Sequence, residues 1–218
     1  MVTIKTIYFC DNTTLAYAWI MKSITSENLR LEVCRVYSEA AQKPAEEQTF
    51  PLGRDFAESL GYPPDLLAGL PTISIDAFTG VSNVSLFADI PTGARVLDLG
   101  CGAGLDSLIA SRRVGSTGKV VGVDFSASML ARACQAAVEF GVGNIVFHQA
   151  DAEDLPVDDS SIDVALVNGI FNLNPEREAI FRELARVLRS NGVVYAAELI
   201  LREPLPEEIR NKPGNWFS

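Results

Sequence analysis

The sequence lacks the residues and patterns that several large classes of protein require. It has one histidine, His148, and its four cysteines form no Cys-x-x-Cys pair, so neither a metal-site spacing nor a disulfide framework is present. No run of roughly 18 apolar residues argues for a membrane-spanning helix, and the N-terminus lacks a signal peptide. Basic residues are scarce, 18 against 28 acidic residues for a net charge of −10, which argues against nucleic acid or an anionic membrane as partner. We therefore predict a cytoplasmic protein with reduced thiols.

The sequence does have a glycine-rich turn directly after a short apolar segment. Residues 96–104 are Val-Leu-Asp-Leu-Gly-Cys-Gly-Ala-Gly, and a helical pattern follows over Leu105–Val114. A strand that turns through glycines into a helix brings bare backbone N–H groups close to a ligand. The spacing is G-x-G-x-G, whereas a dinucleotide fingerprint would need its third glycine at the position of Leu105.

Two acidic residues near this turn narrow the choice of ligand. Asp98 precedes the first glycine, where a carboxylate would repel a pyrophosphate and attract a cationic ammonium or sulfonium. Asp124 ends the strand-like segment Lys119–Val123, twenty residues after Gly104, and a carboxylate there can accept hydrogen bonds from both ribose hydroxyls. A nucleoside with a positive tail and no phosphate satisfies both acids. These residues predict S-adenosylmethionine as the cofactor.

Further cofactor contacts are expected at the other strand ends. We predict that Asp151 and Ala152 contact the adenine, although Asp151 begins an acidic cluster of the kind that is usually a solvated loop. Phe125 and Met129 can pack on the adenine, with ordinary helix core as the alternative. Asn168 would place its carbonyl beside the cofactor's amino group, with a strand cap as the alternative. The backbone of the glycine turn would contact the methionine tail at Gly100, Cys101 and Gly102.

From Ala94 onward the pattern alternates between strands and helices. This alternation predicts an α/β fold with a doubly wound, mostly parallel sheet, whose ligands bind at the carboxyl ends of the strands. Strands are expected at Arg95–Leu99, Lys119–Asp124, Asn144–Gln149, Ile162–Asn168 and Val193–Leu201, and helices at Leu105–Val114, Ser126–Phe140 and Pro175–Leu188.

The first part of the chain differs from this pattern. Helical periodicity over Thr13–Lys22 and Glu27–Gln42 predicts a helical N-terminal extension, residues 1–93, that packs as a lid over the mouth of the sheet. In the second helix Leu29, Val33 and Val36 share one side. Residues 94–218 would then form the S-adenosylmethionine-binding domain.

The motifs described above resemble those of class I S-adenosylmethionine-dependent methyltransferases over about residues 94–203. The resemblance is carried by Asp98–Gly104, Gly122–Phe125, Asp151–Pro156 and Arg182–Leu188. A narrower resemblance, to the arsenite methyltransferase branch, is carried by Leu60–Tyr62, Asp89–Gly93, Asn168–Pro175 and Pro204–Arg210. It implies a Rossmann-like methyltransferase fold and a small-molecule methyl acceptor.

The arsenite branch binds trivalent arsenic through cysteine thiolates, and this sequence departs from that pattern. Val81 and Gly169 stand where the resemblance places two of these cysteines, and a third would follow Trp216-Phe-Ser218. Because a soft metalloid needs soft sulfur ligands, we expect little or no methylation of arsenite.

Family members are expected to continue past Ser218 with a cysteine, a helix and two strands. The resemblance therefore implies a domain truncated at its C-terminus and a sheet without its last two strands. Either an ordinary truncation or a UGA codon for selenocysteine would give such an end. An apolar edge with unpaired backbone groups is sticky, so we expect Val193–Leu201 to be covered by the N-terminal segment or by a second copy in a homodimer.

Three functions are compatible with these residues. The first is a methyltransferase acting on a small molecule, for example a thiol or metalloid compound, since a soft or anionic nucleophile needs no general base. The second is an S-adenosylmethionine-binding protein without turnover, a truncated form of a longer methyltransferase. The third, a nicotinamide oxidoreductase, is disfavoured by Asp98 and Leu105. No catalytic residue is assigned, because the candidate bases are weak: Tyr8, Tyr17, His148 and Glu198.

Overall fold

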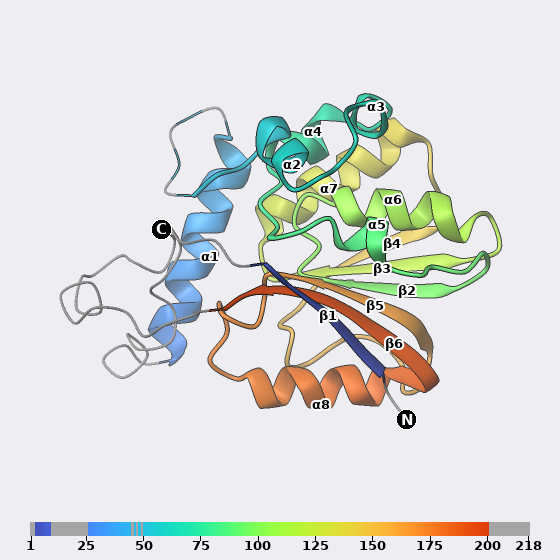
Figure 1. The fold of residues 1–218 in the computed structure, drawn as a ribbon. Coiled ribbons are helices and arrows are strands. Elements are labelled where there is room, and N and C mark those ends of the chain that lie inside the picture. The colour runs from blue at the N-terminus through green and yellow to red at the C-terminus, as the bar shows by residue number, and fades with distance from the viewer. Residues whose placement is uncertain (1–2, 10–25, 45, 47, 49, 201–218) are drawn as a thin grey trace.

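A computed structural model describes residues 3–9, 26–44, 46, 48 and 50–200 of the chain. At its centre lies one six-stranded sheet of order β1-β6-β5-β2-β3-β4 (Figure 1), in which neighbouring strands are parallel. The strands are β1 Thr3–Phe9, β2 Arg95–Leu99, β3 Lys119–Asp124, β4 Ile145–Gln149, β5 Ile162–Asn168 and β6 Leu188–Leu199. The helices are α1 Ser26–Gln42, α2 Arg54–Ser59, α3 Pro64–Ala68, α4 Thr72–Asp76, α5 Val84–Phe87, α6 Leu105–Val114, α7 Ala127–Phe140 and α8 Arg177–Val187. The predicted doubly wound parallel fold is confirmed.

Both faces of the sheet are buried because successive residues of each central strand point to opposite sides. Leu97 of β2 packs in one core with Ile180 of α8, whereas its neighbour Val96 packs in a second core with Val114 of α6. Figure 1 shows α8 on one face of the sheet and α6 and α7 on the other. A fully buried side chain of this size contributes about 1.5–3 kcal/mol, so the two cores fix the sheet that positions the site.

From β2 onward, the predicted element boundaries lie within two residues of those in the structure, apart from the start of β6. Strand β4 begins one residue later than expected, and α8 begins at Arg177 instead of Pro175. Strand β6 begins at Leu188, five residues before the predicted Val193, because the chain turns extended directly after α8. The predicted N-cap of α7 is confirmed, since the Ser126 hydroxyl accepts a hydrogen bond from the Met129 N–H.

Strand β1 corrects the prediction for the N-terminal region. Thr3–Phe9 lies within the predicted helical extension but forms a strand that pairs in parallel with β6, from Thr3 opposite Val193 to Phe9 opposite Leu199. Its sequence is rich in β-branched and aromatic residues, which suit a strand, and β6 without it would present unpaired N–H and C=O groups. The expectation that the N-terminal segment covers this edge is confirmed.

The other helices before β2 agree with the predicted helical extension. Helix α1 matches the predicted Glu27–Gln42, and both Val33 and Val36 are buried. The side chain of Leu29 and the predicted helix Thr13–Lys22 lie outside the described residues. Helix α1 lies at the edge of the sheet where the strands end (Figure 1). None of the described helices is long and apolar enough to cross a membrane.

Strand order reverses between β2 and β5, because β3 and β4 continue to one side of β2 whereas β5 and β6 lie on the other. Crossover connections that leave in opposite directions open a crevice at the carboxyl ends of the two strands, and this is where such sheets bind ligands. The fold therefore predicts a site next to the carboxyl ends of β2 and β5, whose last residues are Leu99 and Asn168.

Candidate cofactor site

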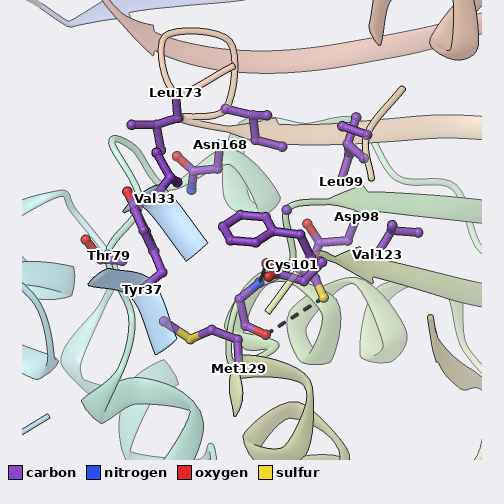
Figure 2. A pocket seen from close by; sticks show the side chains of 18 of the residues that line it. Val33, Tyr37, Thr79, Asp98, Leu99, Cys101, Val123, Met129, Asn168 and Leu173 are labelled. Atoms are coloured by element: carbon purple, nitrogen blue, oxygen red, sulfur yellow. Dashed lines mark hydrogen bonds between the residues drawn. The ribbon is translucent and has the colours of Figure 1, made fainter. Parts of the chain in front are cut away.

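A cavity of about 390 Å³ lies at the carboxyl ends of β2, β3, β4 and β5, with α1 as its outer wall. Figure 2 shows Val33 and Tyr37 of α1 on one side of it and Asp98, Cys101 and Val123 on the other. All ten residues predicted to contact the cofactor line this one cavity: Asp98, Gly100, Cys101, Gly102, Asp124, Phe125, Met129, Asp151, Ala152 and Asn168. The structure therefore brings the predicted residues together, and their individual contacts with a cofactor stay predictions.

The glycine turn between β2 and α6 has the backbone conformation that its sequence predicts. Gly100, Gly102 and Gly104 have φ values of 72°, 51° and 87°. Residues other than glycine rarely adopt this region of backbone conformation. A Cβ at Gly100 would lie 2.5 Å from Cδ1 of Ile170, so this position also requires close approach. A Cβ at Gly102 would meet nothing within 4 Å. The turn thus leaves open space beside Gly102 for a ligand.

Three buried carboxylates surround this turn. Asp98, Asp106 and Asp124 are 2%, 6% and 7% exposed, and among the described residues Arg30 is the one cationic side chain that lines the cavity. Arg30 pairs with Glu153. Buried carboxylates without a cationic partner are costly, so the site is built for a proton or for a ligand that carries positive charge.

The pKa of Asp98 shows this cost directly. Burial raises the pKa to about 8, and the nearby charge of Asp106 adds to the shift. A hydrogen bond of 2.5 Å from the Ser107 hydroxyl to Oδ2 opposes the shift by favouring the charged form. Without a ligand, Asp98 is therefore largely protonated at neutral pH, and a cation beside it would restore the carboxylate.

Asp124 is held by the backbone at the end of β3. Its Oδ2 accepts a hydrogen bond of 2.9 Å from the Gly102 N–H, and its Oδ1 accepts one of 2.8 Å from the Ser126 N–H. Burial raises the pKa of Asp124 to about 6 despite these two donors. Each carboxylate oxygen has a further acceptor site, so the predicted pair of ribose hydroxyls can be accepted without breaking either bond.

Asp106, in the first turn of α6, is a cavity residue that sequence reasoning missed. Its Oδ1 accepts hydrogen bonds from the Tyr62 hydroxyl (2.6 Å) and the Ser85 hydroxyl, and its Oδ2 accepts one of 3.0 Å from Nδ2 of Asn168. Burial raises the pKa of Asp106 as well. The available signal was an acid two residues after Gly104 in an otherwise apolar helix start, but its partners lie far away in the sequence.

The side chain of Asn168 lines the cavity (Figure 2) and also holds the polypeptide through four hydrogen bonds. Its Oδ1 accepts the N–H groups of Val81 (2.8 Å) and Ser82 (3.1 Å), while its Nδ2 donates to the Ser82 carbonyl (2.7 Å) and to Asp106. This behaviour matches the alternative of a strand cap. Because both amide atoms are engaged in these bonds, we expect the predicted contact with a cofactor to come from the backbone carbonyl of Asn168.

The residues predicted to contact the adenine differ in burial. Met129 is 1% exposed and packs with Ala41, Ala77 and Ala103, so the alternative of helix core also describes it. Phe125 is half-buried and makes an edge contact with the Tyr37 ring, with centroids 6.4 Å apart. Asp151 is exposed and Ala152 is half-buried at the end of β4, so the cavity wall here is partly open to solvent.

Helix α1 closes the cavity through contacts that the sequence did not predict. The Arg30 guanidinium pairs with the Glu153 carboxylate in the loop after β4, and Asn174 donates a hydrogen bond of 3.0 Å to the same carboxylate from the loop after β5. Three separate segments therefore meet at Glu153. Leu31, Val33, Cys34 and Tyr37 also line the cavity from α1.

Of the four weak candidates for a general base, the two whose side chains the structure describes do not line the cavity. His148 lies on β4 and Glu198 near the end of β6, and neither belongs to the cavity wall. Tyr17 and the side chain of Tyr8 lie outside the described residues. Among the described residues, no histidine or lysine lines the cavity.

A methyltransferase domain family matches residues 90–217 of the chain. The chain belongs to this family. An arsenite methyltransferase of Halobacterium salinarum is 34% identical over 159 residues, which cover 73% of this chain and 40% of that protein. A ubiquinone/menaquinone biosynthesis C-methyltransferase of Hahella chejuensis is 41% identical over 111 residues, covering 50% of this chain and 44% of that protein.

A solved structure shows the same relationship in three dimensions. An arsenic(III) S-adenosylmethionine methyltransferase from Chlamydomonas reinhardtii superposes with a TM-score of 0.62 at 30% identity, covering 72% of this chain and 57% of that one. The predicted membership of the arsenite methyltransferase-like branch of the S-adenosylmethionine-dependent methyltransferases is confirmed, with S-adenosylmethionine as the implied cofactor. The chain spans about half the length, or less, of the relatives that it matches.

Proposed function

We propose that this chain binds S-adenosylmethionine in the strand-end cavity and transfers its methyl group to a small soft nucleophile, a thiol or a metalloid compound. The observation that carries the proposal is the set of three buried carboxylates, Asp98, Asp106 and Asp124, around the open glycine turn without a free cation in the described cavity wall. The bound cofactor supplies an electrophilic methyl group on a sulfonium, and with it the positive charge that this wall lacks.

The contacts of each cofactor group follow from the position of the residues. The backbone of Gly100, Cys101 and Gly102 faces the open space that suits the methionine tail, and Asp98 would favour its positive charge. Asp124 would accept the ribose hydroxyls. The adenine would lie beside Asp151 and Ala152, against Phe125 and Met129, and the Asn168 carbonyl would lie beside the amino group.

The remaining part of the cavity would hold the methyl acceptor. It is lined largely by apolar side chains: Leu31, Val33 and Tyr37 from α1, and Ile170 and Leu173 from the loop after β5. Methyl transfer from a sulfonium mainly requires the nucleophile to be positioned and water to be excluded. Because no histidine or lysine lines the described wall, an acceptor that is already anionic or soft suits this site better than an alcohol or amine.

Free arsenite is not the acceptor that this wall favours. Val81 and Gly169, where the arsenite branch is expected to carry cysteines, lie side by side: a Cβ on Gly169 would be 3.0 Å from Cγ1 of Val81. Two thiols at these positions could bind one metalloid together, whereas a valine and a glycine offer no ligand. The proposal therefore keeps a thiol as the preferred acceptor.

The second candidate is a protein that binds S-adenosylmethionine without turnover. It is favoured by one observation, that no histidine or lysine lines the described cavity wall and could act as a base toward an acceptor. The two candidates share the cofactor site and differ only in the acceptor side.

One set of assays separates these candidates. The purified chain is incubated with methyl-labelled S-adenosylmethionine and with benzenethiol, phenol, aniline or arsenite, three of which differ only in the nucleophilic atom. We expect transfer to benzenethiol, little to phenol or aniline, and little or none to arsenite. Binding of S-adenosylhomocysteine without transfer to any acceptor would favour the second candidate. Robust formation of methylated arsenic would refute the preference for a thiol over arsenite.

A further inference from the structure

Glu198 is a buried carboxylate that the cofactor site does not use. It lies near the end of β6, is 9% exposed and does not line the cavity. Its carboxylate points instead at the middle of the loop 169–174, which forms most of the connection from β5 to α8.

The Glu198 carboxylate accepts four N–H groups. Oε2 accepts those of Phe171 (2.7 Å) and Asn172 (3.3 Å), and Oε1 accepts Nδ2 of Asn172 (3.1 Å) and the Leu199 N–H (3.2 Å). A carboxylate with two oxygens can accept all of them, whereas a protonated carboxyl has one oxygen committed as a donor. The full set of bonds therefore favours the ionised form.

The same loop forms part of the cavity wall on its other side. Ile170 and Leu173, which flank the two residues bound by Glu198, both line the cavity, and Figure 2 shows Leu173 together with Val33 of α1. Ile170 also packs against the glycine turn, since its Cδ1 would lie 2.5 Å from a Cβ on Gly100. Fixing the centre of the loop from behind thus sets where these two side chains lie.

We propose that Glu198 is a positioning residue, whose ionised carboxylate holds the loop 169–174 so that Ile170 and Leu173 form the acceptor-side wall of the cavity. The expected effect on turnover rests on the proposed function. The position of the loop rests on the hydrogen bonds alone. The proposal predicts that acceptor binding depends on the charge of a residue that touches neither acceptor nor cofactor.

The electrostatic surroundings make this charge sensitive to pH. Burial raises the pKa of Glu198 to about 7, against the N–H donors and the field of Arg177 at the start of α8. Arg177 itself donates a hydrogen bond of 2.6 Å from Nε to the Phe171 carbonyl, so it holds the same loop. On the neighbouring strand β1, Tyr8 is level with Glu198. Below pH 7 the neutral form would dominate and the loop would loosen.

Amide hydrogen exchange at Phe171 and Asn172 tests the proposal directly in the full chain. After correction for intrinsic exchange, we expect protection of both amides to fall at least tenfold as pH decreases from 8.5 to 5.5, with its midpoint near 7. Glu198→Gln should remove the step and leave both amides fast at every pH. The matched control is Glu183→Gln, because Glu183 also accepts a backbone N–H, that of Leu155 (2.8 Å), but lies outside the cavity wall.

Turnover gives a second readout that a merely structural role would not change selectively. With benzenethiol as acceptor, Glu198→Gln should raise the acceptor KM about tenfold while kcat and the affinity for S-adenosylhomocysteine stay within threefold. A flat exchange profile in the unmodified chain, or the same stepped profile in Glu198→Gln, would overturn the proposal. The unmodified chain alone decides it if the variant fails to fold. A stepped profile without any thiol turnover would support the positioning role and count against the proposed function.

Discussion

At the scale of single residues, the described cavity wall gathers three buried carboxylates, and its one cation, Arg30, is already paired with Glu153. Asp98, Asp106 and Asp124 each have a raised pKa because burial disfavours the charged form. Each also accepts hydrogen bonds that favour the charged form, from Ser107, Tyr62 and Gly102 respectively. The balance between these two effects leaves the site close to a protonation change at neutral pH.

Asp124 is the residue whose loss should weaken cofactor binding most. Asp124→Ala removes a charged acceptor for two hydroxyls, and a hydrogen bond to a charged group contributes about 1.5–3 kcal/mol, so affinity for S-adenosylhomocysteine should fall roughly tenfold to a hundredfold. Titration calorimetry measures this. The control is Asp163→Asn, because Asp163 accepts the Arg95 N–H (2.8 Å) away from the cavity. Equal affinities in Asp124→Ala and the unmodified chain would contradict the assigned ribose contact.

Asp98 should link cofactor binding and stability to pH. Its pKa is about 8 in the folded chain, above the ordinary value of 3.8, so the folded state binds the extra proton between these values. The free energy of unfolding of the free chain should therefore fall as pH rises from about 4 to about 8. Asp98→Asn should make this decline shallower in denaturant titrations.

Cofactor binding should reverse the protonation of Asp98. A cation beside it favours the carboxylate, so binding of S-adenosylmethionine at pH 7 should release a proton, measurable by calorimetry in buffers of different ionisation enthalpy. No proton release, or the same release in Asp98→Asn, would show that the cationic tail lies elsewhere.

At the scale of elements, features set by local sequence could be predicted, whereas features set by contacts between distant residues could not. The glycine turn, the Ser126 cap and the strands β2, β3 and β5 follow from periodicity and turn chemistry over a few residues, and the structure confirms them. The roles of Arg30 and Glu153 could not be predicted, because the two residues are 123 positions apart in the sequence. Asp106 was missed for the same reason, since its partners come from α5, β5 and the segment before α3.

Helix α1 is expected to act as a lid that Glu153 holds closed. Glu153→Gln weakens the contact with Arg30. The Arg30 side chain is 38% exposed and that of Glu153 is 12% exposed. A partly exposed ion pair of this kind contributes about 1 kcal/mol or less. The dissociation rate of S-adenosylhomocysteine should rise by up to roughly fivefold in stopped-flow experiments. Glu32→Gln, which removes an exposed pair with Arg35 on the same helix, should leave the rate unchanged. Identical rates in both variants would argue against a lid.

At the scale of the whole molecule, β1 completes a sheet whose last strand would otherwise be bare on one side. The sequence alone predicted that some segment must cover β6 and left open whether it came from the same chain. The sequence did not predict a strand at Thr3–Phe9, because these seven residues mix apolar and polar side chains without a clear strand or helix periodicity. The pairing with β6 depends on tertiary context that no local pattern contains.

Removal of residues 1–9 should therefore expose the outer edge of β6. Unpaired N–H and C=O groups on an apolar strand pair readily with another chain, so we expect the shortened chain to self-associate in a concentration-dependent way. Light scattering at several concentrations, compared with the full chain, measures the change. A shortened chain that stays monomeric and as stable as the full chain would show that β1 does not protect this edge.

The central claim is that the strand-end cavity is the S-adenosylmethionine site, with an acceptor wall made by α1 and the loop 169–174. A crystal structure of the full chain with S-adenosylhomocysteine tests it most directly. We predict ribose hydroxyls within hydrogen-bond distance of both Asp124 oxygens, adenine beside Asp151 and Ala152, and the sulfur facing the space between Val33 and Leu173. Density for the ligand outside this cavity, or a ribose that does not contact Asp124, would contradict the account.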